Sequence, residues 1–276
     1  MMSCPLCNSS KNKFNFNFGK YQLLSCENCG LHYINPYEQK DYDRNPLSLD
    51  KQYEGEIQSV KYFLPLIAKH IINKNSVIDI GCGCGAFLKE CKRLGVKKIV
   101  GIENDFNRAK YARKITNGRI LETEIQNYTV TEKFDVAVLI NVISHIPDLK
   151  AFFLRIDQLL KPKGLLIIKT GLMKKGFRKI NGFDWNIPEH IQFIGEPTPE
   201  YISQKFNFNL KEKLLISLAE DLLSKQYLLS PGRYGFINLT KKIIFYFPFA
   251  RVLIKKLYNL YTKNRLFTSI LVYEKR

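Results

Sequence analysis

The sequence predicts an α/β protein with a doubly wound, mostly parallel sheet, and three observations lead to that prediction. Short apolar runs rich in Val, Ile and Leu recur along the chain, as buried parallel strands do. Helical spacing of apolar residues fills the intervals between the runs, which is the alternation that a parallel sheet requires. A glycine-rich turn follows the first run, and ligands bind at this end of such strands. We expect strands near residues 77–80, 98–102, 119–122, 134–140 and 164–170.

Length and composition limit the function classes. A chain of 276 residues can hold one large α/β domain with a small appendage. No apolar stretch is long enough to span a bilayer, and the start lacks the apolar region of a signal peptide. The seven cysteines are more typical of a protein in a reducing compartment than of a disulfide framework. We therefore expect a cytoplasmic protein. The net charge of +18 attracts polyanions, but no run of five or more Lys and Arg occurs, so a basic surface is favoured over a nucleic-acid partner.

Two C-x-x-C pairs mark the amino terminus, and they consist of Cys4, Cys7, Cys26 and Cys29. Their separation by eighteen residues matches a zinc pattern in which each pair presents two thiolates to one tetrahedral ion. Alternating residues over 14–18 and 21–24 predict a hairpin between the pairs. We expect a structural zinc ribbon over 1–36, with an iron-bound or metal-free module as the alternatives, and a linker over 37–56.

The first expected strand leads directly into a candidate ligand-binding loop. Apolar residues at helical spacing over 57–71 predict a helix that covers the sheet before this strand. After the strand, alternating glycines let the backbone turn sharply and bring its N–H groups close to a ligand. A helix beginning near Ala86 would point its positive end at the same ligand. The glycines of this loop are Gly81, Gly83 and Gly85.

Glu103 stands at the carboxyl end of the second expected strand, eighteen positions after Gly85. An acidic side chain there is placed to accept hydrogen bonds from both ribose hydroxyls of an adenosine-containing cofactor. A glycine loop followed by such an acid is more specific than the loop alone. The two features together predict a nucleoside-bearing cofactor.

The loop resembles that of class I S-adenosylmethionine-dependent methyltransferases, because its glycines alternate and Asp79 precedes the first of them by two residues. The resemblance continues through residues 134–141, 144–148 and 159–168, which look like that family's fourth strand, the short helix over the cofactor, and the turn into its fifth strand. It covers about residues 55–215. It implies a Rossmann-like, seven-stranded sheet and S-adenosylmethionine as the cofactor. The cofactor-binding residues that it implies are Asp79, Gly81, Cys82, Gly83, Gly85, Glu103, Glu124 and Asn141.

Several positions qualify the resemblance. Cys82 and Cys84 occupy variable positions of the loop, and this does not affect cofactor binding. Glu124 follows the third strand, where the family places an acid or amide against adenine, and Glu122 is the competing choice because strand register is uncertain. Asn141 ends the fourth strand but is followed by Val-Ile-Ser, not by the Pro-Pro-aromatic sequence of amino-methylating DNA enzymes. That difference argues against methylation of a base amino group.

The methyltransferase domain is expected over 57–276, closed by two antiparallel strands near 205–216 and 266–273. Between them lies an insertion over 217–263. Within it, residues 243–261 carry an apolar helical stripe with basic residues beside it, although Pro248 would break or bend the helix. Such a helix can lie on an anionic membrane surface, making the protein peripheral to the membrane, or it can pack on its own domain or a second copy.

Two of the four histidines are candidates for catalysis, since an oxygen nucleophile benefits from a general base near neutral pKa. His190 follows Trp185 in the segment after the fifth strand, where the resembled fold builds its substrate wall. The alternative is that His190 belongs to a helix cap and Trp185 fills a gap. His145 lies at the cofactor edge, where the family often uses histidine to shape the pocket. His32 and His70 are expected to be structural.

The function expected from these features is O-methylation of a small acceptor such as a sugar, a lipid-linked compound or a quinone-like ring. A C-methyltransferase acting on a nucleotide sugar is the close alternative. The zinc ribbon and the positive charge also allow an RNA methyltransferase, but dense Arg clusters and ordered stacking motifs are absent from the sequence. A non-catalytic zinc scaffold is disfavoured by the intact glycine loop.

Overall fold

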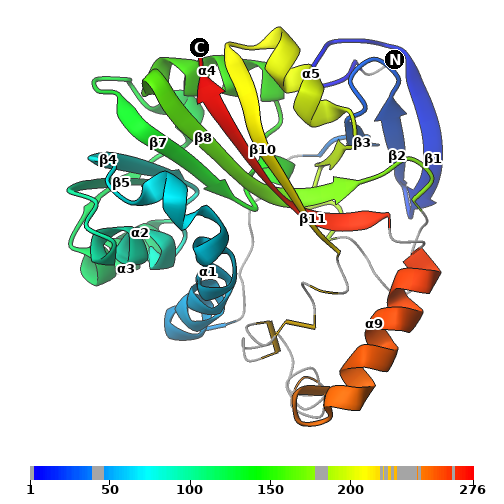
Figure 1. The fold of residues 1–276 in the computed structure, drawn as a ribbon. Coiled ribbons are helices and arrows are strands. Elements are labelled where there is room, and N and C mark those ends of the chain that lie inside the picture. Colours follow the sequence, from blue (N-terminus) through cyan, green and yellow to red (C-terminus); the bar gives the residue numbers. More distant parts are fainter. Residues whose placement is uncertain are drawn as a thin grey trace.

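The computed structural model describes residues 3–38, 47–177, 186–217, 220, 223–224, 227–228, 241, 244–262 and 265–276. The central strands are β4 (Ser76–Ile80), β5 (Lys98–Glu103), β6 (Arg119–Glu122), β7 (Phe134–Ile140), β8 (Leu160–Met173), β10 (Phe208–Ser217) and β11 (Leu266–Lys275). They form a seven-stranded sheet in the order β6-β5-β4-β7-β8-β11-β10 (Figure 1). The strands from β6 to β8 are parallel, and β11 pairs antiparallel with both β8 and β10. This topology confirms the predicted doubly wound sheet and its closing hairpin.

Helices cover both faces of the sheet, because successive side chains of a strand point to opposite faces. On one face lie α1 (Leu49–Ile71), α2 (Ala86–Arg93) and α3 (Phe106–Thr116), and on the other α4 (Leu149–Leu159) and α5 (Thr198–Lys205) (Figure 1). In β4, Val77 packs in the apolar cluster of α1 and α2, whereas Ile78 packs in the cluster of α4. Two short 3₁₀ turns, η1 (Ile125–Asn127) and η2 (Ile143–His145), follow β6 and β7.

Helix α1 begins at Leu49, eight residues before the predicted start, so residues 49–56 belong to the helix and not to the predicted linker. Ser48 is its N-cap, and the Ser48 side chain accepts a hydrogen bond from the Lys51 N–H. The first two turns carry few apolar residues, and periodicity therefore did not reveal them. This correction is functionally relevant because these turns bring Glu56 to the glycine loop.

The amino-terminal module joins the central sheet through strand pairing. It contains β1 (Asn12–Phe18) and β2 (Tyr21–Cys26), which form the predicted hairpin, and β3 (His32–Asn35), which the sequence did not reveal. β3 pairs antiparallel with β9 (Gln192–Gly195), and β9 pairs with the end of β8. The module therefore extends the sheet from the carboxyl end of β8, through β9, and packs beside the segment that precedes β9.

The predicted helix of the insertion is present as α9 (Pro248–Thr262), which lies away from the sheet in Figure 1. Pro248 is the first residue of α9, a position where proline costs no helical hydrogen bond, so it starts the helix and does not break it. The rest of the insertion lies largely outside the described residues. Among the helices of the described ranges, none combines the length and the apolar character needed to cross a bilayer.

Candidate functional site

The glycine loop between β4 and α2 has the left-handed backbone that its sequence predicts. The φ angles of Gly81, Gly83 and Gly85 are 70°, 56° and 87°. A Cβ atom on Gly83 would lie 2.3 Å from Oε1 of Glu56, and one on Gly81 would lie 2.5 Å from a methyl group of Val142. The positive φ angles favour glycine at both positions, and any side chain would also displace Val142 at Gly81 or the Glu56 carboxylate at Gly83.

Asp79, near the end of β4, is a buried acid in need of a partner. Its side chain is 1% exposed, and its Oδ1 atom has no hydrogen-bond partner among the described residues. Burial, with the nearby carboxylates of Glu56 and Glu103, raises the pKa of Asp79 well above its ordinary value. Because a buried polar atom without a partner is costly, this atom is suited to a donor supplied by a ligand.

Glu103 ends β5 and lies against the glycine loop, as predicted. Its Oε2 accepts a hydrogen bond from the Gly83 N–H at 2.9 Å, and its Oε1 accepts one from the Asp105 N–H at 3.0 Å. The guanidinium of Arg108 lies 3.5 Å from Oε1. These contacts orient the carboxylate, which lines the cavity described below.

Glu56 reaches the same loop from α1. Both oxygens of its carboxylate accept from the Cys84 N–H, at 2.9 and 3.1 Å, next to the start of α2. Burial raises the pKa of Glu56 to about 7, although hydrogen bonds from the Cys84 and Ala86 N–H groups act in the opposite direction. The positive end of α2 is thus already contacted by a carboxylate from elsewhere in the chain.

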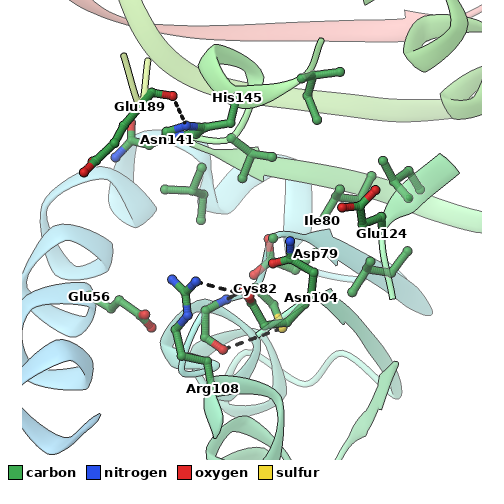
Figure 2. A pocket seen from close by; sticks show the side chains of 18 of the residues that line it. Glu56, Asp79, Ile80, Cys82, Asn104, Arg108, Glu124, Asn141, His145 and Glu189 are labelled. Carbon is green, nitrogen blue, oxygen red and sulfur yellow. Dashed lines mark hydrogen bonds and ion pairs between the residues drawn. The ribbon is translucent and has the colours of Figure 1, made fainter. Parts of the chain in front are cut away.

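A cavity of about 590 Å³ opens beside the loop, and Figure 2 shows the side chains that face it. Of the residues predicted to bind the cofactor, Asp79, Gly81, Cys82, Gly83, Glu103, Glu124 and Asn141 line this cavity. Gly85 does not line it and instead serves as the N-cap of α2. Glu124 is therefore favoured over Glu122, which ends β6 outside the lining and lies 3.7 Å from Arg113.

The two candidate histidines meet at the far wall of the cavity. Their ring centroids are 4.8 Å apart, but only His145 lines the cavity. His145 Nδ1 lies 2.8 Å from the carbonyl oxygen of Glu189, as Figure 2 shows. A carbonyl only accepts, so Nδ1 carries the hydrogen and Nε2 carries the lone pair. Burial lowers the pKa of His145 to about 3, with a further contribution from His190, and the ring is neutral near pH 7.

The segment that carries His190 is fixed by neighbours on two sides. The Ile191 N–H donates to the Ser144 carbonyl, and the Ile34 N–H of the amino-terminal module donates to the Ile191 carbonyl, both at 2.9 Å. The Gln192 side chain donates to the Ile143 carbonyl at 2.9 Å. Asp184 and Trp185, the aromatic candidate of this wall, lie outside the described residues.

His32 and His70 have structural contacts, as expected. The ring of His32 is buried and lies 2.6 Å from the hydroxyl of Ser25, on the neighbouring strand. His70 pairs with Glu212 of β10 at 2.8 Å, which joins α1 to the sheet hairpin.

The four cysteines of the amino-terminal module converge as their spacing predicts. All four sulfur atoms lie within 4.8 Å of one another, with Cys4 and Cys29 at 3.5 Å and Cys7 and Cys26 at 3.4 Å. Tetrahedral zinc with bonds of about 2.3 Å requires sulfur atoms about 3.8 Å apart, so the arrangement fits a single ion. The site is closed, since four thiolates leave no position for substrate.

Three charged residues near the site had no usable sequence signal: Glu56, Arg108 and Lys169. Lys169 is buried in β8, with its Nζ 3.4 Å from Oδ1 of Asn141 and 5.8 Å from the ring of Phe63. Arg108 follows the N-cap of α3 by three residues, a place where nothing in the sequence marks a pocket contact. Glu56 and Lys169 act through contacts between segments 28 residues apart, which only the fold reveals, whereas Arg108 contacts the nearby Glu103.

Comparisons with known proteins agree with this geometry. A family profile described as "Methyltransferase domain" matches residues 50–213. A ubiquinone biosynthesis O-methyltransferase of Rhodopseudomonas palustris (strain BisA53) is 28% identical over 153 residues, covering 51% of this chain and 52% of that protein. The chain thus spans about half the length of this curated relative.

Solved structures show the same fold at low sequence identity. Geranyl diphosphate C-methyltransferase from Streptomyces coelicolor A3(2), solved with Mg²⁺, geranyl diphosphate and S-adenosyl-L-homocysteine, has a TM-score of 0.58 at 13% identity, covering 82% of each chain. A putative sarcosine dimethylglycine methyltransferase from Galdieria sulphuraria has a TM-score of 0.55 at 14% identity, covering 80% of this chain and 84% of that one. With the profile match over more than half of the sequence, the chain belongs to the class I S-adenosylmethionine-dependent methyltransferases.

Proposed function

We propose that this protein transfers a methyl group from S-adenosylmethionine to a hydroxyl oxygen of a small acceptor, such as a quinone-like ring, a sugar or a lipid-linked compound. The observation that carries the proposal is one continuous cavity, lined by Asp79 and Glu103 at the glycine loop and by His145 at the opposite wall. The name of the Rhodopseudomonas relative supports an oxygen acceptor of the quinone type.

The residues at the loop would hold the cofactor, which supplies an electrophilic methyl group when bound. The partnerless Oδ1 of Asp79 would accept a hydrogen bond from a cofactor N–H group, and ionisation of Asp79 would balance the positive charge. Glu103 would accept from the ribose hydroxyls, held in place by Gly83 and Arg108. Glu124 would contact the adenine.

The histidine pair would orient the acceptor. The Nε2 lone pair of neutral His145 is suited to accept a hydrogen bond from the acceptor hydroxyl and direct its oxygen toward the methyl group. A pKa of about 3 makes His145 a weak base, so its proposed role is orientation. His190 lies behind His145 and does not line the cavity, so its proposed role is to position the His145 ring.

The test uses full-length, zinc-loaded protein incubated with methyl-labelled S-adenosylmethionine and fractionated cell extract. Label is expected in small hydroxylated compounds and in their lipid-soluble forms. Label confined to RNA, or to a product whose methyl group resists ether cleavage, would contradict O-methylation of a small molecule.

We also propose that the four cysteines hold one structural zinc ion. Their mutual distances support this, and thiolate zinc sites contribute directly to folding. Elemental analysis of protein purified without added metal should give one zinc per chain, and Cys4→Ser should lose the zinc and lower the melting temperature. One iron per chain, or no metal in a stable protein, would refute the zinc assignment.

We further propose that α9 contacts an anionic membrane surface from the cytoplasmic side. Its exposed side chains include Phe249, Leu253 and Leu257, spaced four residues apart along one face, and Arg251 and Lys256 add positive charge. Flotation with phosphatidylserine vesicles should recover the wild type but not Phe249→Ser/Leu257→Ser.

The control for this test is Leu154→Ser, which changes an exposed apolar residue of α4. Equal flotation of all three proteins would contradict the assignment. A wild-type dimer that the α9 substitutions convert to a monomer, without any vesicle binding, would also contradict it and would assign the face to a second copy.

A further inference from the structure

The cavity contains donor groups that ordinarily attract anions, and the protein's own carboxylates already engage them. A glycine loop followed by a helix N-terminus is a common anion-binding arrangement. Here the Cys84 N–H donates to Glu56 and the Gly83 N–H donates to Glu103. Arg108, the single arginine or lysine among the described lining residues, faces Glu103 at 3.5 Å.

The remaining charges of the described lining are negative, although the chain as a whole carries +18. Some are balanced, because Glu38 accepts from Lys20 at 2.7 Å and from the Tyr21 hydroxyl at 2.8 Å. The six lining carboxylates are Glu38, Glu56, Asp79, Glu103, Glu124 and Glu189. Burial raises the pKa of Asp79 well above its ordinary value, and Glu103 is paired with Arg108. The unbalanced negative charge of the described lining is therefore that of Glu124 and Glu189, joined by Glu56 as the pH rises past its pKa of about 7, and it is opposite in sign to the protein's net charge.

Two of these carboxylates belong to the wall that faces the glycine loop. Glu189 lines the cavity, and Figure 2 shows its backbone carbonyl beside the ring of His145 while its side chain extends away from that ring. Glu38 and its neighbour Tyr37 line the cavity directly after the amino-terminal module. Tyr37 packs in the same apolar cluster as Ile187 and Ile191 of the histidine wall. The two residues that directly follow the module thus line the cavity, and the module holds them beside the histidine wall.

We propose that the acceptor is an uncharged or cationic hydroxylated compound, and that phosphate-bearing acceptors are excluded. This inference rests on the proposed methyl transfer and narrows its substrate class. A phosphate entering the cavity would find the loop N–H groups and Arg108 already bonded to carboxylates, and beside the histidine wall it would meet Glu189. An unpaired anion beside like charges is strongly disfavoured, and this discriminates against nucleotide sugars and nucleic acid.

The same charges favour the cofactor over its product. S-adenosylmethionine carries a net positive charge and S-adenosylhomocysteine carries none, so a cavity of negative potential binds the donor more strongly and releases the product more readily. An anionic acceptor would oppose this potential, whereas a neutral or cationic acceptor would not.

The test is a charge series of three catechols, measured by calorimetry on full-length, zinc-loaded protein saturated with S-adenosylhomocysteine. The probes are 4-methylcatechol, which is neutral, dopamine, which is cationic, and 3,4-dihydroxybenzoate, which is anionic. Dopamine and 4-methylcatechol are expected to bind at least about 10-fold more tightly than the benzoate, a difference typical of one unfavourable charge contact. Tightest binding of the benzoate, or binding by none of the three compounds, would overturn the proposal.

Substitutions identify the source of the preference. Glu38→Gln/Glu189→Gln should reduce the discrimination against the benzoate by about 3-fold or more, since two wall charges are removed. The matched control is Glu27→Gln/Glu196→Gln, which removes two exposed charges outside the cavity and should leave the series unchanged. Equal behaviour of the two double variants would refute the role of the wall carboxylates.

UDP-glucose provides the direct counter-test with the same complex. No binding is expected at concentrations that saturate 4-methylcatechol, whereas tighter binding of UDP-glucose than of the catechols would overturn the inference. Failure of the proposed function has a different signature, because S-adenosylhomocysteine itself would then not bind. If the protein binds S-adenosylhomocysteine but binds 3,4-dihydroxybenzoate more tightly than the other two catechols, only the proposed acceptor class is contradicted.

Discussion

Replacing Glu56 by Gln is expected to remove a pH-dependent loss of stability from the cofactor-free protein. The pKa of Glu56 is raised from its ordinary value of 4.5 to about 7, chiefly because burial disfavours the charged carboxylate. The native state therefore binds this proton more tightly than the unfolded chain does. The resulting stabilisation is complete below pH 4.5, declines as the pH rises to about 7, and changes no further above that.

The magnitude follows from the size of the shift. Each pKa unit corresponds to about 1.4 kcal/mol, so this single group is expected to lower the free energy of unfolding by at most about 2.5 kcal/mol between pH 5 and pH 8. Partial solvent contact at the cavity reduces this value. Glutamine keeps an acceptor for the Cys84 N–H but cannot ionise, so Glu56→Gln should lack this part of the pH dependence.

The assay is urea unfolding of zinc-loaded wild type and Glu56→Gln at pH 5, 6, 7 and 8 without cofactor. The unfolding free energy of Glu56→Gln minus that of the wild type should increase steadily up to pH 7 and then level off. Glu54→Gln, which removes an exposed acid from the same helix, is the matched control and should follow the wild type. A wild-type minus Glu56→Gln difference that stays constant within about 0.5 kcal/mol would refute the reasoning.

Three further substitutions test the site. Asp79→Asn cannot ionise against a cationic ligand, so calorimetry should show cofactor affinity reduced about 10-fold or more without lower stability, and unchanged affinity would argue against this contact. Gly83→Ala places a Cβ 2.3 Å from Glu56 and strains a left-handed residue, so melting temperature and cofactor affinity should both fall; normal values for both would contradict the need for glycine. His145→Gln should chiefly raise the acceptor KM, and His190→Gln should do the same more weakly with cofactor affinity intact, because His190 positions the His145 ring; normal kinetics in His190→Gln would refute that role.

The sequence predicted those features that depend on local pattern. The strands of the parallel sheet were recognisable because each is buried on both faces and therefore almost continuously apolar. The loop was recognisable because its positive φ angles require glycine, and the cysteine module because metal geometry dictates its spacing. Glu103 was recognisable because it is an acidic residue at the carboxyl end of the strand that follows the glycine loop and its helix.

The features that the sequence did not reveal depend on contacts between distant segments. β3 pairs with β9 across about 160 residues, and its four residues have no distinct strand pattern. Glu56 lies in helical turns with few apolar residues, and its partner Cys84 is 28 residues away. The choice between Glu124 and Glu122 depends on where β6 ends, a detail that propensity determines only to within a few residues.

The most direct test of the central claim is calorimetric titration of zinc-loaded, folded protein with S-adenosylmethionine and, separately, with S-adenosylhomocysteine. The structure predicts one binding site per chain for each compound, and it predicts that Asp79→Asn weakens both. Absence of binding heat for both compounds at several temperatures, in protein shown to be folded, would contradict the assignment of the glycine loop as a methyl-donor site.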